Sequence, residues 1–175
     1  MIIYKDLIND DELISDAYDI KVVDDIVYEV DCAMITEGGV AINIGANASA
    51  EDADEGVDDP DVKTVNNVIT GQRLQATSFD AASYTAYVKG WMSNLVKKWS
   101  DPESKNPKTP EEIKALKGAL GSYIKKKILG HFNDYEFFTG EKMDPDAMVV
   151  LLNYREDGVT PYVIIFKDGV WAQKL

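Results

Sequence analysis

The chain has very few residues that form covalent or metal cross-links. Among its 175 residues there are one cysteine, Cys32, and one histidine, His131. A single cysteine cannot form a disulfide within the chain, which fits a reducing compartment. Structural zinc sites draw four ligands mainly from cysteine and histidine, so the usual zinc site is excluded. Because no histidine and no cysteine-enzyme signature lies near Cys32, we interpret this residue as a small buried side chain and not as a nucleophile.

Long apolar runs and catalytic motifs are also missing. No run approaches the roughly 20 apolar residues that span a bilayer, and charged residues such as Lys5, Asp6 and Asp10 occupy the place of a signal peptide's apolar segment. We therefore expect a cytoplasmic protein without a membrane span. The sequence has no nucleophile elbow, no phosphate-binding glycine loop and no thiol pair, so we expect no enzymatic activity.

Charge is abundant but unevenly distributed. The net charge is −13, yet the segment from Asp80 to Gly130 holds ten lysines and five acids, a local net of +5 that leaves −18 for the rest (−13 minus 5). A chain this acidic is a poor general binder of nucleic acids, because phosphates repel it. Within the basic segment, Lys125, Lys126 and Lys127 form either a solvated face or a docking face for an acidic protein partner.

The most acidic stretch is residues 37–65, where eight acids precede the first basic residue, Lys63. Such a stretch repels itself and has little apolar surface, which predicts a long flexible acidic loop. It matches a calcium loop in composition only. An EF-hand has glycine at position 6, whereas Asp52, Asp54 and Gly56 place glycine at position 5. Any calcium binding here would be weak.

Residues 78–130 have the pattern of two helices. Apolar residues recur at helical spacing in both halves, and Asp101-Pro102 separates them. The second helix has a complete start signal, with Thr109 as N-cap, Pro110 in the first turn and Glu112 at the third position. Gly130 is the expected C-terminal cap. The apolar stripes are Tyr84, Val88, Trp91, Met92, Leu95 and Trp99, then Ile113, Leu116, Leu120, Ile124 and Ile128. We predict an antiparallel helical hairpin.

The rest of the chain has strand character. Three apolar, β-branched and aromatic runs between residues 132 and 168 predict a three-stranded antiparallel meander, whose uniformly apolar middle run must be covered on both faces. Further strands are expected at 1–7, 20–24, 26–31 and 65–76. The acidic segment 9–16 has two interpretations. It is either a solvated turn or helical half-turn without a function, or an electronegative docking point or part of a cation site.

Several stretches, in order along the chain, together resemble the translationally controlled tumour protein family. Met1-Ile2-Ile3-Tyr4-Lys5-Asp6-Leu7 with Asp11-Glu12 resembles its N-terminus. Residues 44–51 (IGANASAE) and 137–149 (FFTGE to DAMV) resemble its two signatures, and residues 154–169 complete the likeness. Many animal members end in a cysteine that supports a disulfide-linked dimer, whereas this chain ends in Leu175, so that dimer is not expected here.

The resemblance implies a single α+β domain over residues 1–175. It would consist of a β-tent of mostly antiparallel strands, a projecting helical hairpin (78–130) and a long mobile acidic loop (37–65). It also implies a non-enzymatic protein of several partners in growth and survival control. These partners are tubulin and microtubules, anti-apoptotic partners bound through the hairpin, and the Ras-like small GTPase Rheb, whose nucleotide exchange the family is implicated in promoting.

The resemblance and the acidic segments together nominate three sets of site residues. Asp11 and Glu12 are the expected GTPase contact, and Lys125, Lys126 and Lys127 are the expected contact for tubulin's acidic surface. No cofactor is expected to be required. A weak Ca²⁺ site would draw on oxygen ligands from Asp10, Asp11, Asn47, Glu51 and Asp52. The alternative function is a calcium buffer or sensor without a GTPase role.

Overall fold

The computed structural model describes residues 1–36, 40–41 and 64–175, with 40–41 as backbone only. The predicted flexible acidic loop, 37–65, therefore lies outside the described residues, apart from positions 40–41 and 64–65. Those four positions belong to strands of a small antiparallel sheet with the order β6-β5-β7. Its strands are β5 (Met34–Thr36), β6 (Val40–Ala41) and β7 (Thr64–Asn66).

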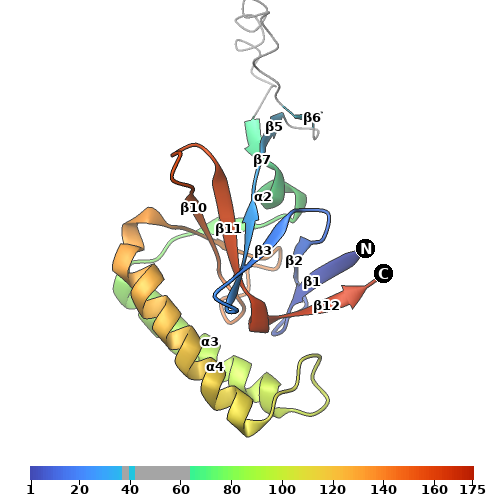
Figure 1. Ribbon diagram of the computed structural model, residues 1–175, viewed down its shortest axis with the longest axis vertical. Helices are drawn as coiled ribbons and strands as arrows, with labels where there is room; N and C mark the ends of the chain where they lie inside the picture. Colours follow the sequence, from blue (N-terminus) through green and yellow to red (C-terminus); the bar gives the residue numbers. More distant parts are fainter. Residues whose placement is uncertain (37–39, 42–63) are drawn as a thin grey trace, which may run out of the picture.

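The main sheet has six antiparallel strands in the order β3-β4-β11-β10-β9-β8. The predicted meander is confirmed, because β9, β10 and β11 are neighbours in it (Figure 1). Val150, Leu151 and Leu152 are all buried although successive side chains point to opposite faces, so both faces of β10 are covered. The strands are β3 (Ile20–Val23), β4 (Val27–Asp31), β8 (Gln75–Thr77), β9 (Glu136–Thr139), β10 (Val150–Tyr154) and β11 (Pro161–Phe166).

The turn between β3 and β4 explains why two acids interrupt an apolar run. Asp24 and Asp25 both have φ +56°, and the backbone N–H of Ile26 donates to the carbonyl of Val23 at 3.0 Å. Two positive φ values in a two-residue loop match the right-handed twist of the flanking strands. Aspartate tolerates this left-handed conformation better than most residues. The predicted strand pair at 20–24 and 26–31 is confirmed.

A second sheet places β1 (Ile2–Asp6) between β12 (Val170–Lys174) and β2 (Glu12–Ser15), all antiparallel. The two chain ends therefore lie side by side (Figure 1). The interpretation of segment 9–16 as a solvated turn or helical half-turn is wrong for residues 12–15. Leu13 and Ile14 are fully buried in β2, so packing against the core decides the conformation of this short acidic segment.

The strand expected over residues 65–76 is also wrong in part. A short helix, α2 (Asn67–Gly71), separates β7 from β8. The side-chain oxygen of Asn66 accepts hydrogen bonds from the backbone N–H groups of Val68 and Ile69 and so caps the helix. The β-branched residues of this helix favour strand when read in isolation, and the burial of Val68 overrides that preference.

The predicted start of the second helix is confirmed, because α4 (Pro110–Tyr123) begins with a reciprocal capping box between Thr109 and Glu112. The first helix, α3 (Ala81–Ser100), begins with a capping box between Asp80 and Ser83. The predicted helix end is wrong. Gly130 does not close the second helix, because the chain continues as a π-helical turn, η1 (Ile124–Ile128), and a 3-10 helix, η2 (Leu129–Asp134).

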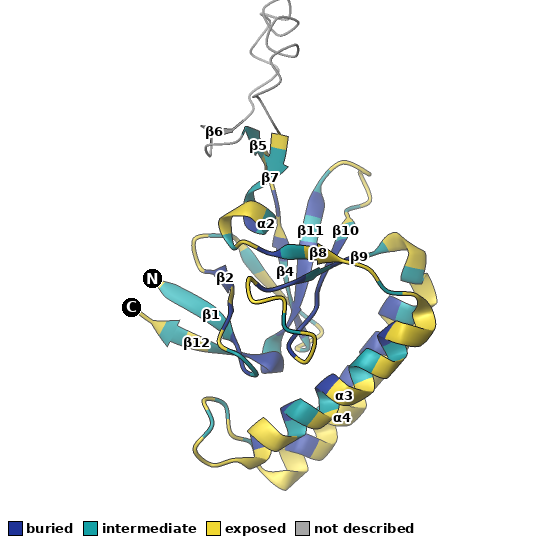
Figure 2. Ribbon diagram, turned by 180° about the vertical axis from the view of Figure 1, so that it is seen from behind, coloured by how far each residue is buried: buried dark blue, intermediate teal, exposed yellow. Residues whose placement is uncertain are grey.

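The hairpin packs on the main sheet through aromatic side chains of both helices. The ring of Phe166 on β11 contacts Trp91 at 5.2 Å and Tyr123 at 6.0 Å between centroids. Trp99 is fully buried, and its Nε1 donates to the carbonyl of Asp168 at 2.9 Å. Exposed residues cover the side of the hairpin that faces away from the sheets (Figure 2). Within the part of the chain that the structure describes, no helix is long and apolar enough to cross a bilayer.

Candidate functional site

Three separate segments meet at a polar cleft of about 400 Å³, which we call the acidic cleft. The turn between β1 and β2 contributes two acids and the first residue of β2 a third. The end of α2 contributes its last glycine and the two residues after it, and the loop after β9 contributes one acid. The lining residues are Asp10, Asp11, Glu12, Gly71, Gln72, Arg73 and Glu141. The cleft thus contains both predicted GTPase-contact residues, Asp11 and Glu12.

Asp11 is held inside the protein and does not project from it. Its side chain is 4% exposed, and its carboxylate accepts hydrogen bonds from the backbone N–H of Lys142 and the amide of Asn9, both at 3.2 Å. The carboxylate also lies so close to Gly140 that a Cβ added there would fall within 2.8 Å of the Asp11 Cβ. Asp11 therefore fastens the β1–β2 turn to the loop after β9.

Glu12 is the freely presented acid of the cleft. It is exposed at the first position of β2, and among the described residues its carboxylate has no hydrogen-bond or ion-pair partner. The other exposed acids are engaged. Asp10 accepts a 2.7 Å hydrogen bond from Nε1 of Trp171, and Glu141 lies 3.3 Å from the guanidinium of Arg73. Glu12 is thus carried on a strand whose next two residues are fully buried, which fixes its backbone.

A second buried acid, Asp6, lies at the end of β1 and was not singled out from the sequence. Its two carboxylate oxygens accept from the backbone N–H groups of Ile8 at 2.9 Å and Met148 at 2.8 Å. Burial raises the pKa of Asp6 to about 6, an effect that the two hydrogen bonds oppose and the charges of Asp11 and Asp144 reinforce. No local sequence pattern predicts the burial of Asp6, because its second hydrogen-bond partner, Met148, is 142 positions away.

The structure describes only two of the five predicted calcium ligands. Asp10 and Asp11 lie together at the acidic cleft, whereas Asn47, Glu51 and Asp52 lie outside the described residues. Over residues 1–36 and 64–175, no three histidine, cysteine, aspartate or glutamate side chains group in a way that could hold a metal ion. The five-residue calcium set stays a prediction.

The three predicted lysines occupy an unusual turn. Lys125, Lys126 and Lys127 are all exposed in η1, between the buried residues Ile124 and Ile128. We call these lysines the basic turn. A π-helical turn contains more residues than an α-helical one, and such turns are frequent at functional sites. The basic turn and the acidic cleft belong to different elements and share no residue.

Comparison with known proteins agrees with this architecture. The family model described as "Translationally controlled tumour protein" matches residues 1–171. Proteins described as translationally-controlled tumor protein homologs in Gibberella zeae and Saccharomyces cerevisiae are 55% and 51% identical over 175 residues, covering all of both chains.

Two solved structures of similar fold carry related descriptions. The translationally controlled tumor-associated protein p23fyp from Schizosaccharomyces pombe is 50% identical with a TM-score of 0.77, and the match covers 100% of both chains. The translationally-controlled tumor protein from Caenorhabditis elegans is 27% identical with a TM-score of 0.71, covering 100% of this chain and 99% of that one. The α+β fold class is confirmed, and the chain belongs to the translationally controlled tumour protein family.

Proposed function

We propose that the protein is a binding protein, without catalysis of its own, that contacts a Ras-like small GTPase through the acidic cleft. The observation that carries this proposal is the position of Glu12. Its carboxylate is exposed and unpaired among the described residues, and it stands beside Asp11, which fastens the turn to the loop after β9. A rigidly held, uncompensated carboxylate is suited to meet a positive group on a partner.

The GTPase supplies such positive groups when it has lost its nucleotide. Small GTPases hold the phosphates through backbone N–H groups, a lysine and Mg²⁺. The Mg²⁺ is lost with the nucleotide, and the lysine and the N–H groups are left uncompensated in the empty state. Glu12 would place a negative charge against them. A ligand that binds one state more tightly shifts the population toward that state by its difference in affinity. Nucleotide exchange could then be promoted without any bond being made or broken by this protein.

Calorimetric titration against nucleotide-free, GDP-loaded and GTP-loaded forms of a Rheb-like GTPase tests the proposal. We expect the tightest binding to the nucleotide-free form and a loss of at least about thirtyfold in affinity with Glu12→Lys, the scale expected when one partner of a close charge pair is removed. Because Glu12 is exposed, its substitution should leave the thermal midpoint nearly unchanged.

Glu156→Lys is the matched control, since it makes the same charge change at an exposed position of the loop between β10 and β11. Its affinity for the GTPase should stay close to that of the parent protein. If Glu12→Lys and Glu156→Lys weakened GTPase binding equally, the loss of affinity would be explained by net charge alone, and Glu12 would not be part of the binding site.

A second proposed contact joins the basic turn to the acidic surface of tubulin. It is favoured by the exposure of three successive lysines in a protein of net charge −13. Co-sedimentation with microtubules should weaken steeply as salt increases, because exposed charges are screened over about 8 Å at physiological ionic strength. Reversal of Lys125, Lys126 and Lys127 to glutamate should abolish it. Reversal of Lys89, Lys114 and Lys117, exposed elsewhere on the hairpin, is the control, and the opposite ranking would exclude the basic turn.

The alternative proposal is a calcium buffer or sensor without a GTPase role. Asp10 and Asp11 would provide two of its ligands, although both carboxylates already accept hydrogen bonds in the structure. Titration with Ca²⁺, followed by amide chemical shifts, separates the two proposals. Saturable shifts below millimolar Ca²⁺ at residues 10–11 and in the 47–52 segment, together with unchanged GTPase affinity for Glu12→Lys, would favour the calcium function.

A further inference from the structure

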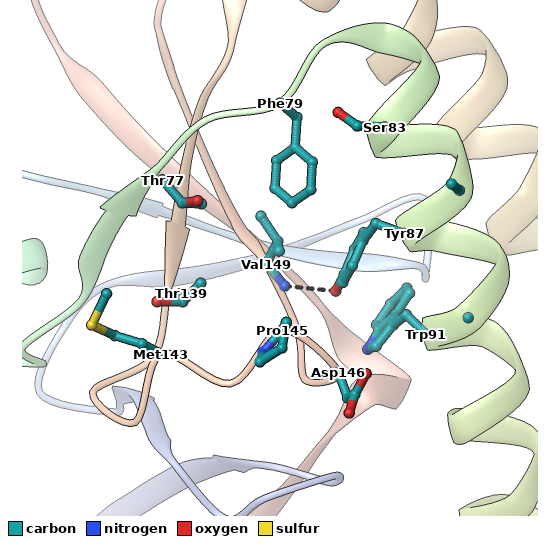
Figure 3. Close-up of a pocket in the computed structure, with 12 residues that line it drawn as sticks. Thr77, Phe79, Ser83, Tyr87, Trp91, Thr139, Met143, Pro145, Asp146 and Val149 are labelled. Atoms are coloured by element: carbon teal, nitrogen blue, oxygen red, sulfur yellow. Dashed lines mark hydrogen bonds between the residues drawn. The ribbon is translucent and has the colours of Figure 1, made fainter.

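A cavity of about 410 Å³ lies between α3, the strands β8 and β9, and the loop that precedes β10. Figure 3 shows its walls. Tyr87 and Trp91 project from α3 and Phe79 from the segment between β8 and α3, whereas Met143, Pro145 and Val149 lie on the opposite loop. Mostly apolar cavities of this volume with a few polar groups are the usual form of small-molecule sites. None of the residues that line this cavity lines the acidic cleft.

One buried polar group beside this cavity is unsatisfied. Trp91 is 2% exposed, and its Nε1 has no hydrogen-bond acceptor among the described residues. The other two indoles are satisfied, because Trp99 donates to the carbonyl of Asp168 and Trp171 donates to Asp10. Buried donors are nearly always paired in folded proteins. In Figure 3 the indole nitrogen of Trp91 lies on the side of the ring toward Pro145 and Asp146, which also line the cavity.

The remaining polar groups restrict what a ligand can be. The hydroxyl of Tyr87 is already used twice, since it donates to the carbonyl of Ala147 at 2.6 Å and accepts from the backbone N–H of Val149 at 2.9 Å. Among the described residues that line the cavity there is no lysine or arginine, and the one carboxylate is that of Asp146. A negatively charged ligand would be repelled there. The hydroxyls of Ser83 and Thr139 already donate to backbone carbonyls. The buried donor that lacks an acceptor among the described residues is the Trp91 N–H, which calls for a neutral molecule with an acceptor oxygen.

The α3 wall of the cavity contains a gap at Gly90. A Cβ built on this residue would meet no atom within 4 Å, so a larger side chain could enter the cavity without a clash. Gly118 on α4 has equally open surroundings and does not line this cavity. The same substitution at both positions gives the same helix-propensity change, so the two variants differ in whether the cavity is filled.

We propose that this cavity binds a compact, neutral aromatic molecule whose carbonyl oxygen accepts a hydrogen bond from Nε1 of Trp91. The ring of the ligand would pack among Phe79, Tyr87 and Val149, and the short exposed segment that carries Met143 and Pro145 would adjust to admit the oxygen. The site is independent of the GTPase contact at Glu12.

Acetophenone and ethylbenzene test the proposal, because they differ by the carbonyl oxygen alone. Each compound is added to uniformly ¹⁵N-labelled protein at 1 mM, which is about the dissociation constant expected for so small a ligand. The three indole N–H resonances are followed, and the spectrum of Trp91→Phe identifies the resonance that belongs to Trp91. We expect acetophenone to move the Trp91 N–H proton downfield and to bind about two- to tenfold more tightly than ethylbenzene. Benzoate, the charged analogue, should cause no shift.

Gly90→Leu should abolish the response to both neutral probes, whereas Gly118→Leu should retain it. In Trp91→Phe, acetophenone and ethylbenzene should bind equally, since the donor is gone while an aromatic ring remains. The proposal is overturned if the Trp91 N–H moves equally with ethylbenzene, if benzoate binds as well as acetophenone, or if Gly90→Leu leaves the acetophenone response intact.

Discussion

Replacing Asp6 with asparagine should remove a pH-dependent part of the protein's stability. Asp6 is 1% exposed, and its pKa is raised from 3.8 to about 6 by burial. In the unfolded chain the carboxyl is in water and its pKa returns to the ordinary value. Between pH 3.8 and 6 the folded protein therefore holds a proton at Asp6 that the unfolded chain has released.

The sign of the effect follows from this proton. Stability falls with rising pH wherever the folded state binds more protons than the unfolded state. The contribution of Asp6 is thus greatest below pH 3.8 and is lost as the pH rises through about 6. Since one pKa unit corresponds to 1.36 kcal/mol, a shift of about two units makes the loss on the order of 3 kcal/mol.

Asparagine keeps the shape of the side chain but cannot titrate. Its single carbonyl oxygen can replace the acceptor for Ile8 or for Met148 but not for both, which adds a cost of about 1–3 kcal/mol that does not depend on pH. Urea unfolding of both proteins at intervals from pH 4 to 8 measures the difference directly. The stability of the parent relative to Asp6→Asn should fall by roughly 3 kcal/mol between pH 4 and 7. A constant difference over this range would refute the raised pKa.

Two further substitutions test the packing near the functional surfaces. Gly140→Ala should lower the unfolding free energy by about 1–3 kcal/mol, because its Cβ would press on the carboxylate of Asp11. Its control, Gly121→Ala, lies in open space on α4 and should raise the unfolding free energy by about 0.5–1 kcal/mol. If urea unfolding ranked the two variants the other way, the close approach of Gly140 to Asp11 would be contradicted. Arg155→Lys should lower the unfolding free energy by about 1 kcal/mol in the same assay, because the Arg155 guanidinium stacks 3.8 Å from the ring centre of Tyr162 and pairs with Glu29 and Asp31. Its control, Arg73→Lys, alters an exposed ion pair and should change stability by less than about 0.5 kcal/mol. Equal effects of the two substitutions would argue against the stacked geometry.

Locally encoded features were predictable from the sequence. The start of α4 was correct because Thr109, Pro110 and Glu112 lie within four residues and satisfy one another. The meander from β9 to β11 was correct because each strand is an apolar run with turn residues at its ends. The predicted end of the second helix was wrong, since the π-helical turn depends on the burial of Ile124 and Ile128 and no single residue in the sequence marks that turn.

The candidate site was only partly predictable for the same reason. Its acids near position 12 stand out in the sequence, but the acidic cleft also needs Arg73 and Glu141, which are brought there by β-sheet pairing between distant segments. Burial separates the roles of two adjacent acids, because Asp11 is enclosed and Glu12 is not. The cavity beside Trp91 left no sequence pattern, since the aromatic residues that line it have the spacing of ordinary core residues.

The position of β1 has a consequence for how the chain acquires its structure during synthesis. Met1 accepts a backbone hydrogen bond from Leu175, and Ile2 is paired with Lys174, so β1 pairs with a strand that is synthesised more than 160 residues later. Until residues 170–174 emerge, one edge of β1 has no mate. Nascent chains stalled short of residue 170 should therefore expose a strand edge open to chaperones or to improper association, and emergence of residues 170–174 should close it.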